Sequence, residues 1–467
     1  QGVVAMKQRG NKRERGTAEV GGRAKKLTAA SSAGSRGRAS STASDAPVLT
    51  VGVNVDNPVP HKKTPNPGYN GDNLVLVMVG LPARGKSYIA QKVSHYLSFF
   101  HGVDVKVFNA GQYRRKLFGA QKSADYFNPG NTAAEKERMT CVTAAMDDMQ
   151  AWIKPGLGRI GVLDATNSTR DRRDWVMAQL AGKVAKHHVV FIESICNDAE
   201  LIASNVRSVK LSMPDYAGMD KEQAAADFLR RIAEYEKVYE TLADKSLSWI
   251  KCIDSGRGIH VNNIRGYLPG RIMHFVNSLH TTKRVIYLSR HGQSEYNTMG
   301  KIGGDSDLSP LGEAFARRLA SFAKNTILAG NPRARLWTSS LRRTIATGRH
   351  IAHDVQPDGW VTMRPKIWRA MDELYAGVFD GRTYAEIAEA APEEAAARAR
   401  DKLTYCYPRG ESYVDVIKRL DPIIHAAEQL KEPLLIIAHQ GILRLLIAYF
   451  HGKGRDEAPH LKFPLHK

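Results

Sequence analysis

The sequence has few cysteines and no long apolar run, and both shortages restrict what the protein can be. Its four cysteines, Cys141, Cys196, Cys252 and Cys406, are far apart and form no Cys-x-x-Cys pair. This spacing fits neither a zinc site nor a disulfide framework, so we expect a reducing, cytoplasmic compartment. No apolar run reaches the roughly 18 residues of a membrane-spanning helix. The basic N-terminus also lacks the apolar stretch of a signal peptide.

Acidic residues are scarce relative to basic ones. The chain has 68 Lys and Arg against 47 Asp and Glu, a formal net charge of +21. Such a charge suits nucleic acid, an anionic membrane or small phosphorylated substrates. We find no nucleic-acid-binding module, and the basic residues do not alternate with aromatic ones, which make up 8% of the chain. We therefore favour small polyanionic substrates and expect neither nucleic acid nor membrane as a partner.

The first 72 residues differ in composition from the rest. They are rich in Gly, Ala, Ser, Lys and Arg, and then in Pro and Asn, which predicts a disordered basic tail at 1–72. Within it, Arg36-Gly-Arg38-Ala-Ser40 is either a solvated polar segment or a phosphorylation site for a basophilic kinase. The sequence starts with Gln1 rather than Met, as a fragment would.

The remaining 395 or so residues alternate between strand-like and helix-like patterns, which predicts two α/β domains, at 73–283 and 284–467. In the first, helices are expected at 88–99 and 133–152, on both faces of a parallel sheet. The strands expected in the first domain are 74–79, 105–109, 160–164, 189–194 and 247–253. In the second domain strands are expected from 285, at 335–338 and at 434–439.

A glycine-framed loop follows the first of these strands. Gly80-x-x-x-x-Gly85-Lys86-Ser87 matches the P-loop template in full. Glycines let backbone N–H groups converge on phosphate oxygens, and the next helix directs its positive end at them. Lys86 can bridge the β- and γ-phosphates, and the Ser87 hydroxyl can bind Mg²⁺. The motif predicts a nucleotide-binding site from which phosphate is transferred.

A phosphoryl acceptor and its binding groups are also expected near the P-loop. Asp164 ends the strand at 160–164, where it could bind Mg²⁺ through water or take the proton of an attacking hydroxyl. Basic side chains cluster on what we interpret as loops, and arginine forks suit phosphate geometry. They indicate an acceptor that already carries phosphate. These basic residues are Arg114, Arg115, Arg138, Arg170, Arg172 and Arg173.

A second constellation lies downstream. Arg290 and His291 end one strand, and His439 ends another. Ends of parallel strands meet at one sheet edge, so these groups point to phosphoryl transfer to a histidine. Arg342 and Arg343 follow a further strand, and Glu373 is a candidate acid for the leaving oxygen. The sequence thus predicts one site that adds phosphate and another that removes it.

With both sites in view, the chain resembles the 6-phosphofructo-2-kinase/fructose-2,6-bisphosphatase family. The motifs that carry the resemblance run from about residue 74 to 466 in the family's order. They include GLPARGKS, FNAGQYRR, DATNSTRDRR, RHGQSEYN, GKIGGDSDLS and YPRGESY. The resemblance implies a P-loop kinase domain followed by a phosphoglycerate-mutase-like histidine phosphatase domain. It also implies synthesis and hydrolysis of fructose 2,6-bisphosphate, with ATP and Mg²⁺, in a homodimer.

By position, the resemblance assigns roles in the kinase half. Asp164, Cys196 and Lys86 match active-site positions, although direct phosphoryl transfer needs no cysteine nucleophile. The residues implied to hold ATP are Gly80, Leu81, Pro82, Ala83, Arg84, Gly85, Lys86, Ser87, Tyr88, Asn205 and Lys210. Those implied to bind fructose 6-phosphate are Arg114, Arg138, Thr166, Arg172, Lys210, Arg231 and Tyr235.

In the phosphatase half it implies that His291 becomes phosphohistidine while Glu373 protonates the leaving oxygen. His439, Arg290 and Arg343 would stabilise the transferring group. The implied sugar-bisphosphate ligands are Arg290, Asn297, Gly303, Tyr384, Arg398, Lys402, Tyr413, Gln440 and Arg444. The chain departs from the family's usual residues at Gln293, Tyr375, Phe379 and Cys406.

Two other functions remain open on sequence alone. The net charge would also suit a nucleic-acid end-processing kinase–phosphatase. A scaffold with one inactive domain could use its basic tail to bind an acidic partner. Salt-dependent nucleic-acid binding or loss of turnover would distinguish these from the bifunctional enzyme.

Overall fold

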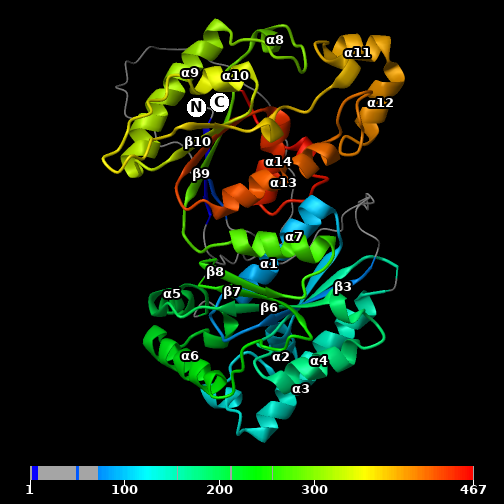
Figure 1. Ribbon diagram of the computed structural model, residues 1–467, viewed down its shortest axis with the longest axis vertical. Coiled ribbons are helices and arrows are strands. Elements are labelled where there is room, and N and C mark those ends of the chain that lie inside the picture. The colour runs from blue at the N-terminus through cyan, green and yellow to red at the C-terminus, as the bar shows by residue number, and fades with distance from the viewer. Residues whose placement is uncertain are drawn as a thin grey trace, which may run out of the picture.

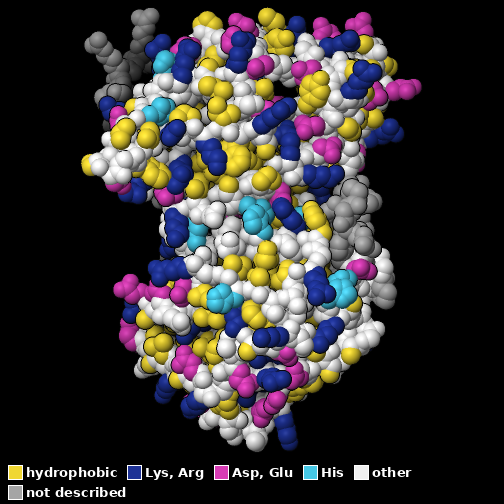
Figure 2. Space-filling view, in the orientation of Figure 1, with side chains coloured by type: hydrophobic (Ala, Val, Ile, Leu, Met, Phe, Trp, Pro, Cys, Tyr) yellow, Lys and Arg dark blue, Asp and Glu magenta, His cyan; other side chains and the backbone are white. Residues whose placement is uncertain are grey.

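The computed structural model describes residues 3–8, 49–51, 72–154, 156–210, 213–254 and 256–465, with backbone only for 3–8, 49–51 and 209–210. Two α/β lobes lie along the long axis of the molecule, each built on its own sheet (Figure 1). Residues from 72 to Ser278 form one lobe, and residues from Val285 onward form most of the other. Lys and Arg side chains are spread over both lobes among acidic ones on the face in Figure 2.

The sheet of the N-terminal lobe confirms the strands predicted there. The strands from β3 to β7 are parallel to one another, and β8 is antiparallel to β7. In spatial order they are β4 (Val105–Asn109), β5 (Ile160–Asp164), β3 (Leu74–Val79), β6 (Val189–Ile195), β7 (Ser248–Ile253) and β8 (Gly258–Asn262). Helices cover both faces, so β3 is at most 2% exposed along its length. A strand buried on both faces reads as a continuous apolar run, which explains why it was predictable.

The helices of this lobe connect the strands. They are α1 (Lys86–His101), α2 (Ala110–Phe118), α3 (Thr132–Trp152), α4 (Arg170–Leu180), α5 (Ala199–Asn205), α6 (Lys221–Glu236) and α7 (Tyr267–Ser278). Shorter helical turns include η1 (Ala124–Phe127) and η3 (Val206–Lys210).

The sheet of the C-terminal lobe holds β11 (Pro365–Ile367), β10 (Arg335–Thr338), β12 (Leu434–Ala438) and β9 (Val285–Arg290) in parallel order. Its helices are α8 (Glu295–Thr298), α9 (Pro310–Phe322), α10 (Arg342–Gly348), α11 (Tyr384–Ala390), α12 (Pro392–Arg400), α13 (Tyr413–Gln429) and α14 (Gln440–Phe450). The turn η6 (Arg369–Met371) precedes Glu373.

Two further strands of this sheet come from the segment expected to be disordered. β1 (Val3–Gln8) pairs antiparallel with β9, and β2 (Leu49–Val51) pairs parallel with β1. The rest of the predicted tail, up to residue 71, lies outside the described residues. The edge of β9 offers unpaired backbone groups, and the β-branched Val3 and Val4 suit a strand. The candidate phosphorylation segment at 36–40 lies outside the described residues.

The two lobes share a continuous apolar core at their junction. Helices α1 and α7 pack against α13 there (Figure 1). Tyr96 of α1 stacks on Phe275 with ring centroids 4.1 Å apart. Its hydroxyl donates to Asp421 Oδ1 of α13 at 2.8 Å. The helix that starts at the P-loop therefore contacts the other lobe directly.

Candidate functional sites

The P-loop has the backbone geometry that its glycines allow. Gly80 adopts a φ of 131°, and a Cβ there would lie 2.6 Å from the carbonyl oxygen of Ser194. Gly85 adopts a φ of 89° at the start of α1. Lys86 is 8% exposed, and its Nζ donates to the carbonyl of Leu81 at 2.6 Å. The lysine thus lies folded over the loop in which phosphates would bind.

Asp164 and Cys196 lie at the ends of strands that flank β3. Asp164 is 4% exposed and accepts a 2.5 Å hydrogen bond from Asn109 Nδ2 at the end of β4. This fixes the carboxylate at the sheet edge beside the P-loop. Cys196 is buried, and burial raises the pKa of its thiol. A protonated thiol is a poor nucleophile, in keeping with direct transfer.

Other residues assigned to ATP lie around the loop with one exception. Asn205 Nδ2 donates to the carbonyl of Ala83 at 3.0 Å, and Arg84 pairs with Glu236 at 3.2 Å. The Tyr88 hydroxyl instead donates to the carbonyl of His280 at 3.4 Å, at the lobe junction. Lys210 ends η3, and its side chain is outside the description.

Three of the predicted arginines contact residues of η1, and a fourth lies near one of those three. Arg231 lies 3.6 Å from the Phe127 ring centroid and Arg114 lies 5.7 Å from it. Arg138 donates to the carbonyl of Tyr126. Burial is the main cause that lowers the pKa of Arg172, and the charge of Arg138 adds to it. Cations held this close together would be stabilised by a bound phosphate dianion.

The expected position of these basic residues on loops is wrong, because each lies within a helix. Arg114 and Arg115 belong to α2, Arg138 to α3, and Arg170, Arg172 and Arg173 to α4. Arg173 is buried and donates to the carbonyls of Asn167 and Glu240, which is a structural role. Asp215, which the sequence did not single out, binds both Arg114 and Arg115.

His291 lies at the carboxyl edge of the second sheet, directly after β9. It is 3% exposed, and its Nδ1 lies 2.7 Å from the carbonyl oxygen of Gly292. A carbonyl can only accept, so Nδ1 carries the hydrogen. The lone pair is then on Nε2, which is the nucleophilic nitrogen.

His439 and two arginines surround that nucleophile. The ring centroids of His291 and His439 are 5.1 Å apart. His439 is fully buried and its Nε2 lies 2.7 Å from Ser339 Oγ. Burial, then the charge of Arg343, lowers its pKa well below the ordinary value, so the ring is neutral. Among the described residues, His439 Nδ1 and Arg290 Nε are buried without a hydrogen-bond partner. Both are available to phosphoryl oxygens.

Glu373 lies at the edge of a cavity of about 820 Å³ that Arg343 also lines. Its carboxylate accepts hydrogen bonds from the backbone N–H of Gly441, at 3.1 and 3.2 Å to the two oxygens. The N–H of Leu374 donates to Oε1 at 3.0 Å. These bonds hold the carboxylate next to the start of α14 and hence near His439.

A second basic group is formed by Arg398, Lys402 and Arg444. Arg398 Nη2 donates to the Tyr384 hydroxyl at 3.0 Å, and Arg444 Nη1 donates to the Tyr413 hydroxyl at 3.2 Å. Burial, then Arg444 and Arg398, lowers the pKa of Lys402 to about 8. The structure thus brings together all five of these residues implied to bind the sugar bisphosphate.

Of the last three assigned residues, Gly303 lines the cavity beside Glu373 and the other two have local roles. Asn297 accepts from the backbone N–H of Ser294 in the capping box of α8, and Gln440 starts α14 beside His439. Gly303 has a φ of 68°, and a Cβ there would clash with Asp380 at 1.7 Å. Sequence reasoning missed Ser339, Gly441 and Arg419, because none belongs to a motif with a recognisable spacing.

The four departures from the family pattern differ in position. Phe379 is 6% exposed within a small apolar cluster, whereas Tyr375 is 52% exposed at the cavity. Gln293 Oε1 accepts a hydrogen bond from Ser309 at 2.8 Å. Cys406 is an exposed thiol 3.5 Å from the carbonyl oxygen of Gly410. None displaces His291, Glu373 or His439.

The described part of the chain lacks a clustered metal-binding group and a membrane-spanning helix. It contains no group of three or more His, Cys, Asp or Glu side chains arranged to hold a metal ion. Nor does any helix in it have the length and apolar character needed to cross a membrane.

Comparison with known proteins identifies both halves. The 6-phosphofructo-2-kinase family matches residues 62–283, and branch 1 of the histidine phosphatase superfamily matches residues 286–467. A 6-phosphofructo-2-kinase/fructose-2,6-bisphosphatase of Arabidopsis thaliana is 46% identical over 400 residues, which are 84% of this chain and 51% of that protein. The Aquarana catesbeiana enzyme of the same name is 42% identical over 405 residues, 86% of this chain and 82% of that protein.

A third relative, 6-phosphofructo-2-kinase/fructose-2,6-bisphosphatase 1 of Rattus norvegicus, is 42% identical over 86% of this chain and 82% of its own length. The chain spans about half the length of the Arabidopsis relative. These matches confirm the resemblance. The chain belongs to the 6-phosphofructo-2-kinase/fructose-2,6-bisphosphatase family, with a kinase domain followed by a histidine phosphatase domain.

Proposed function

We propose that this member of the family both makes and hydrolyses fructose 2,6-bisphosphate, and so regulates glycolysis and gluconeogenesis. The observation that carries the proposal is the presence of two phosphate-handling sites in one chain. One has a P-loop beside a group of arginines, and the other has a buried His291–His439 pair beside Glu373. The product of the first site is the substrate of the second.

In the kinase half, the arginines around η1 bind the 6-phosphate of fructose 6-phosphate. Thr166 lies beside the P-loop, because its carbonyl accepts from the Gly80 N–H at 2.9 Å. Asp164 takes the proton of the sugar O2 hydroxyl as that oxygen attacks the γ-phosphorus of ATP, and the bond from that phosphorus to the bridging oxygen breaks to release ADP. Lys86 stabilises the charge that develops on the transferring group.

Mg²⁺ fits the donor set present. It is usually held by one or two carboxylates together with substrate phosphates and water. Asp164 and the Ser87 hydroxyl would supply the protein's share, and the ion would neutralise charge on the phosphates. This assignment depends on the chemistry of the donors alone.

In the phosphatase half, His291 Nε2 attacks the phosphorus of the 2-phosphate and the bond from phosphorus to O2 breaks. Glu373 gives its proton to the departing O2. The resulting carboxylate then takes a proton from water, whose oxygen attacks the phosphohistidine and releases phosphate. Arg290, Arg343 and neutral His439 stabilise the transferring group, while the cluster around Lys402 holds the 6-phosphate.

Two assays on one preparation test the proposal. The first measures ATP-dependent formation of an acid-labile sugar bisphosphate, and the second measures phosphate release from the 2-position. Lys86→Ala should abolish synthesis and leave hydrolysis intact, and His291→Ala should do the reverse. Retention of both activities in either variant would refute the assignment of that residue.

The family also leads us to propose a cytoplasmic homodimer whose partners are fructose 6-phosphate, fructose 2,6-bisphosphate and ATP, with no nucleic acid or membrane partner. Sedimentation of the purified chain, with and without added DNA or vesicles, tests this. A monomer, or salt-sensitive DNA binding, would contradict it.

A further inference from the structure

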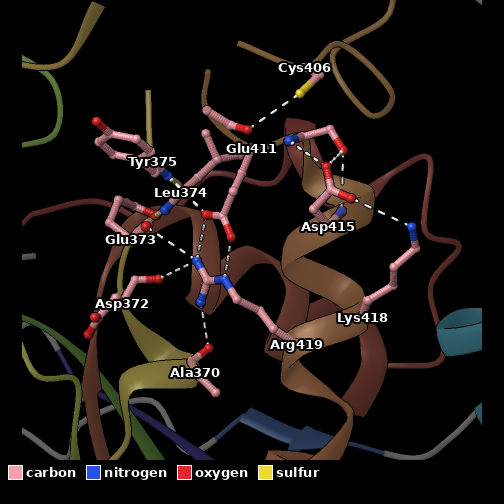
Figure 3. Close-up of polar contacts among 12 residues, drawn as sticks. Ala370, Asp372, Glu373, Leu374, Tyr375, Cys406, Glu411, Asp415, Lys418 and Arg419 are labelled. Atoms are coloured by element: carbon pink, nitrogen blue, oxygen red, sulfur yellow. Dashed lines mark hydrogen bonds and ion pairs between the residues drawn. The ribbon is translucent and has the colours of Figure 1, made fainter. Parts of the chain in front are cut away.

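Arg419 lies on α13 next to the segment that carries Glu373, and it donates to three backbone carbonyls of that segment (Figure 3). Its Nη1 donates to the carbonyl of Ala370 at 2.5 Å. Its Nη2 donates to the carbonyl of Asp372 at 2.7 Å and reaches that of Glu373 at 3.3 Å. One guanidinium therefore holds the backbone immediately before and at the catalytic acid.

Glu411 completes the arrangement from the other side. It accepts from Arg419 Nε at 2.8 Å and from Nη2 at 3.1 Å. It also accepts from the backbone N–H of Tyr375 at 3.0 Å, and its own N–H donates to the Tyr375 carbonyl at 2.9 Å. The Arg419–Glu411 pair thus binds the segment on both sides of Glu373.

The segment needs such partners because it is neither helix nor strand after η6. Its carbonyls lack the partners that regular structure supplies, and buried carbonyls must be satisfied. The planar guanidinium presents several N–H groups in a fixed fork, which suits several carbonyls at once. Arg419 borders the same cavity as Glu373. Its N–H groups are nevertheless directed at protein carbonyls and at Glu411, which balances its charge, so they are already engaged without a substrate phosphate.

We propose that Arg419, held by Glu411, is a positioning residue that sets where the Glu373 carboxylate lies relative to the leaving oxygen. Gly441 fixes the carboxylate itself, and Arg419 fixes the backbone from which it projects. The inference rests on the proposed phosphatase function of Glu373. It assigns a role to Arg419 and Glu411, neither of which is proposed to contact the transferring phosphoryl group.

The main test compares Arg419→Gln, Arg419→Lys and Glu411→Gln with Lys418→Gln as a matched control. Lys418 directly precedes Arg419 on the same helix, and its side chain is about half exposed. Among the contacts drawn in Figure 3 it pairs only with Asp415. Misplacement of an acid by about 1 Å costs roughly 10²-fold in rate. We expect kcat for fructose 2,6-bisphosphate hydrolysis to fall about 10–100-fold in the first three variants, with KM within about twofold.

Arg419→Lys distinguishes positioning from simple charge. Lysine keeps the positive charge but cannot form the fork, so a positioning role predicts no rescue. Recovery of the full rate in Arg419→Lys would overturn the proposal. So would a rise in KM at unchanged kcat, which would mean that Arg419 binds substrate.

A double-mutant cycle tests whether the effect passes through the acid. In a Glu373→Gln background, adding Arg419→Gln should lower kcat by less than about twofold. If Arg419→Gln lowers kcat in the Glu373→Gln background as much as it does in the wild-type chain, the proposal is overturned, because Arg419 would then act independently of Glu373.

Kinase activity of the same chain reports folding. If Arg419→Gln loses kinase activity as well, Glu411→Gln becomes the deciding variant. Its kcat for fructose 2,6-bisphosphate hydrolysis must fall while its kinase activity persists. An unchanged kcat for hydrolysis overturns the proposal. Failure of the proposed function looks different, because wild-type chain would then release no phosphate, or His291→Ala would still release it.

Discussion

Lys92 and Glu428 form an ion pair across the junction of the two lobes, with Nζ and Oε1 2.8 Å apart and side chains 15% and 2% exposed. Lys92 belongs to α1, the helix that starts at the P-loop. Glu428 belongs to α13, the helix that carries Arg419. Arg284 lies 3.7 Å from the second oxygen of Glu428. Although burial opposes ionisation, Lys92 and Arg284 hold the pKa of Glu428 below its ordinary value.

Breaking this pair should destabilise the chain strongly. In Glu428→Gln, Lys92 and Arg284 stay buried without a carboxylate, which typically costs about 3–5 kcal/mol. Denaturant unfolding should show that loss. Glu457→Gln is the control, because its pair with Lys453 is 40–42% exposed and contributes less than about 1 kcal/mol. An equal effect of the two variants would contradict the prediction.

The same ion pair should make the stability of the folded chain fall at low pH. Because the folded-state pKa of Glu428 is lowered from 4.5, its stabilisation is present above that value and is lost as pH falls through the folded-state pKa. Glu428→Gln should therefore lose less stability than the wild-type chain below about pH 4.5, as thermal unfolding across pH would show. Parallel curves for the two proteins would exclude this contribution.

Gly441→Ala should impair the phosphatase selectively. A Cβ at Gly441 would lie 2.5 Å from Glu373 Oε1, so the carboxylate must move. We expect kcat for hydrolysis to fall about 10²-fold with kinase activity unchanged. Gly330→Ala is the matched control, because among the described residues no atom outside its own helix and chain neighbours lies within 4 Å of its added Cβ. Full phosphatase activity in Gly441→Ala would show that this contact does not position the acid.

Arg231→Gln should weaken binding of the sugar phosphate to the kinase half. Arg231 stacks over Phe127 with its Nε buried and unpartnered among the described residues. A charge-assisted hydrogen bond is worth about 1.5–3 kcal/mol, so KM for fructose 6-phosphate should rise about 10–100-fold. The neighbouring Arg230, 74% exposed beside Asp227, supplies the control Arg230→Gln. Equal KM values in the two variants would place the phosphate elsewhere.

Sequence predicted the fold where strands are buried on both faces, as β3 and β12 are, because such strands are continuous apolar runs. It failed where pairing depends on the rest of the sheet. β8 has no buried residue and pairs antiparallel with β7, and β1 pairs with β9, a strand far along the chain. Neither pairing can be read from the strand's own residues.

Some residues of the candidate sites could be predicted from the sequence and others could not. Lys86 and His291 could be found because a motif fixes them to a strand end. Arg419 and Glu411 could not, since they act on the backbone of a segment about 40 residues earlier in the chain. The arginines of α2 and α4 were expected on loops because sequence does not show how soon after a strand each helix begins.

Lys402 should give the phosphatase an alkaline limit in substrate binding. Burial, then Arg444 and Arg398, lowers its pKa to about 8, so the ammonium group loses its proton as pH rises through that value. The positive charge is thus present below pH 8 and lost above it, and KM for fructose 2,6-bisphosphate should rise about 10–100-fold between pH 7 and 10. Lys402→Arg should remove this rise, because arginine stays charged, whereas Lys402→Met should have a high KM at every pH. An identical alkaline rise in Lys402→Arg would assign the titration to another group.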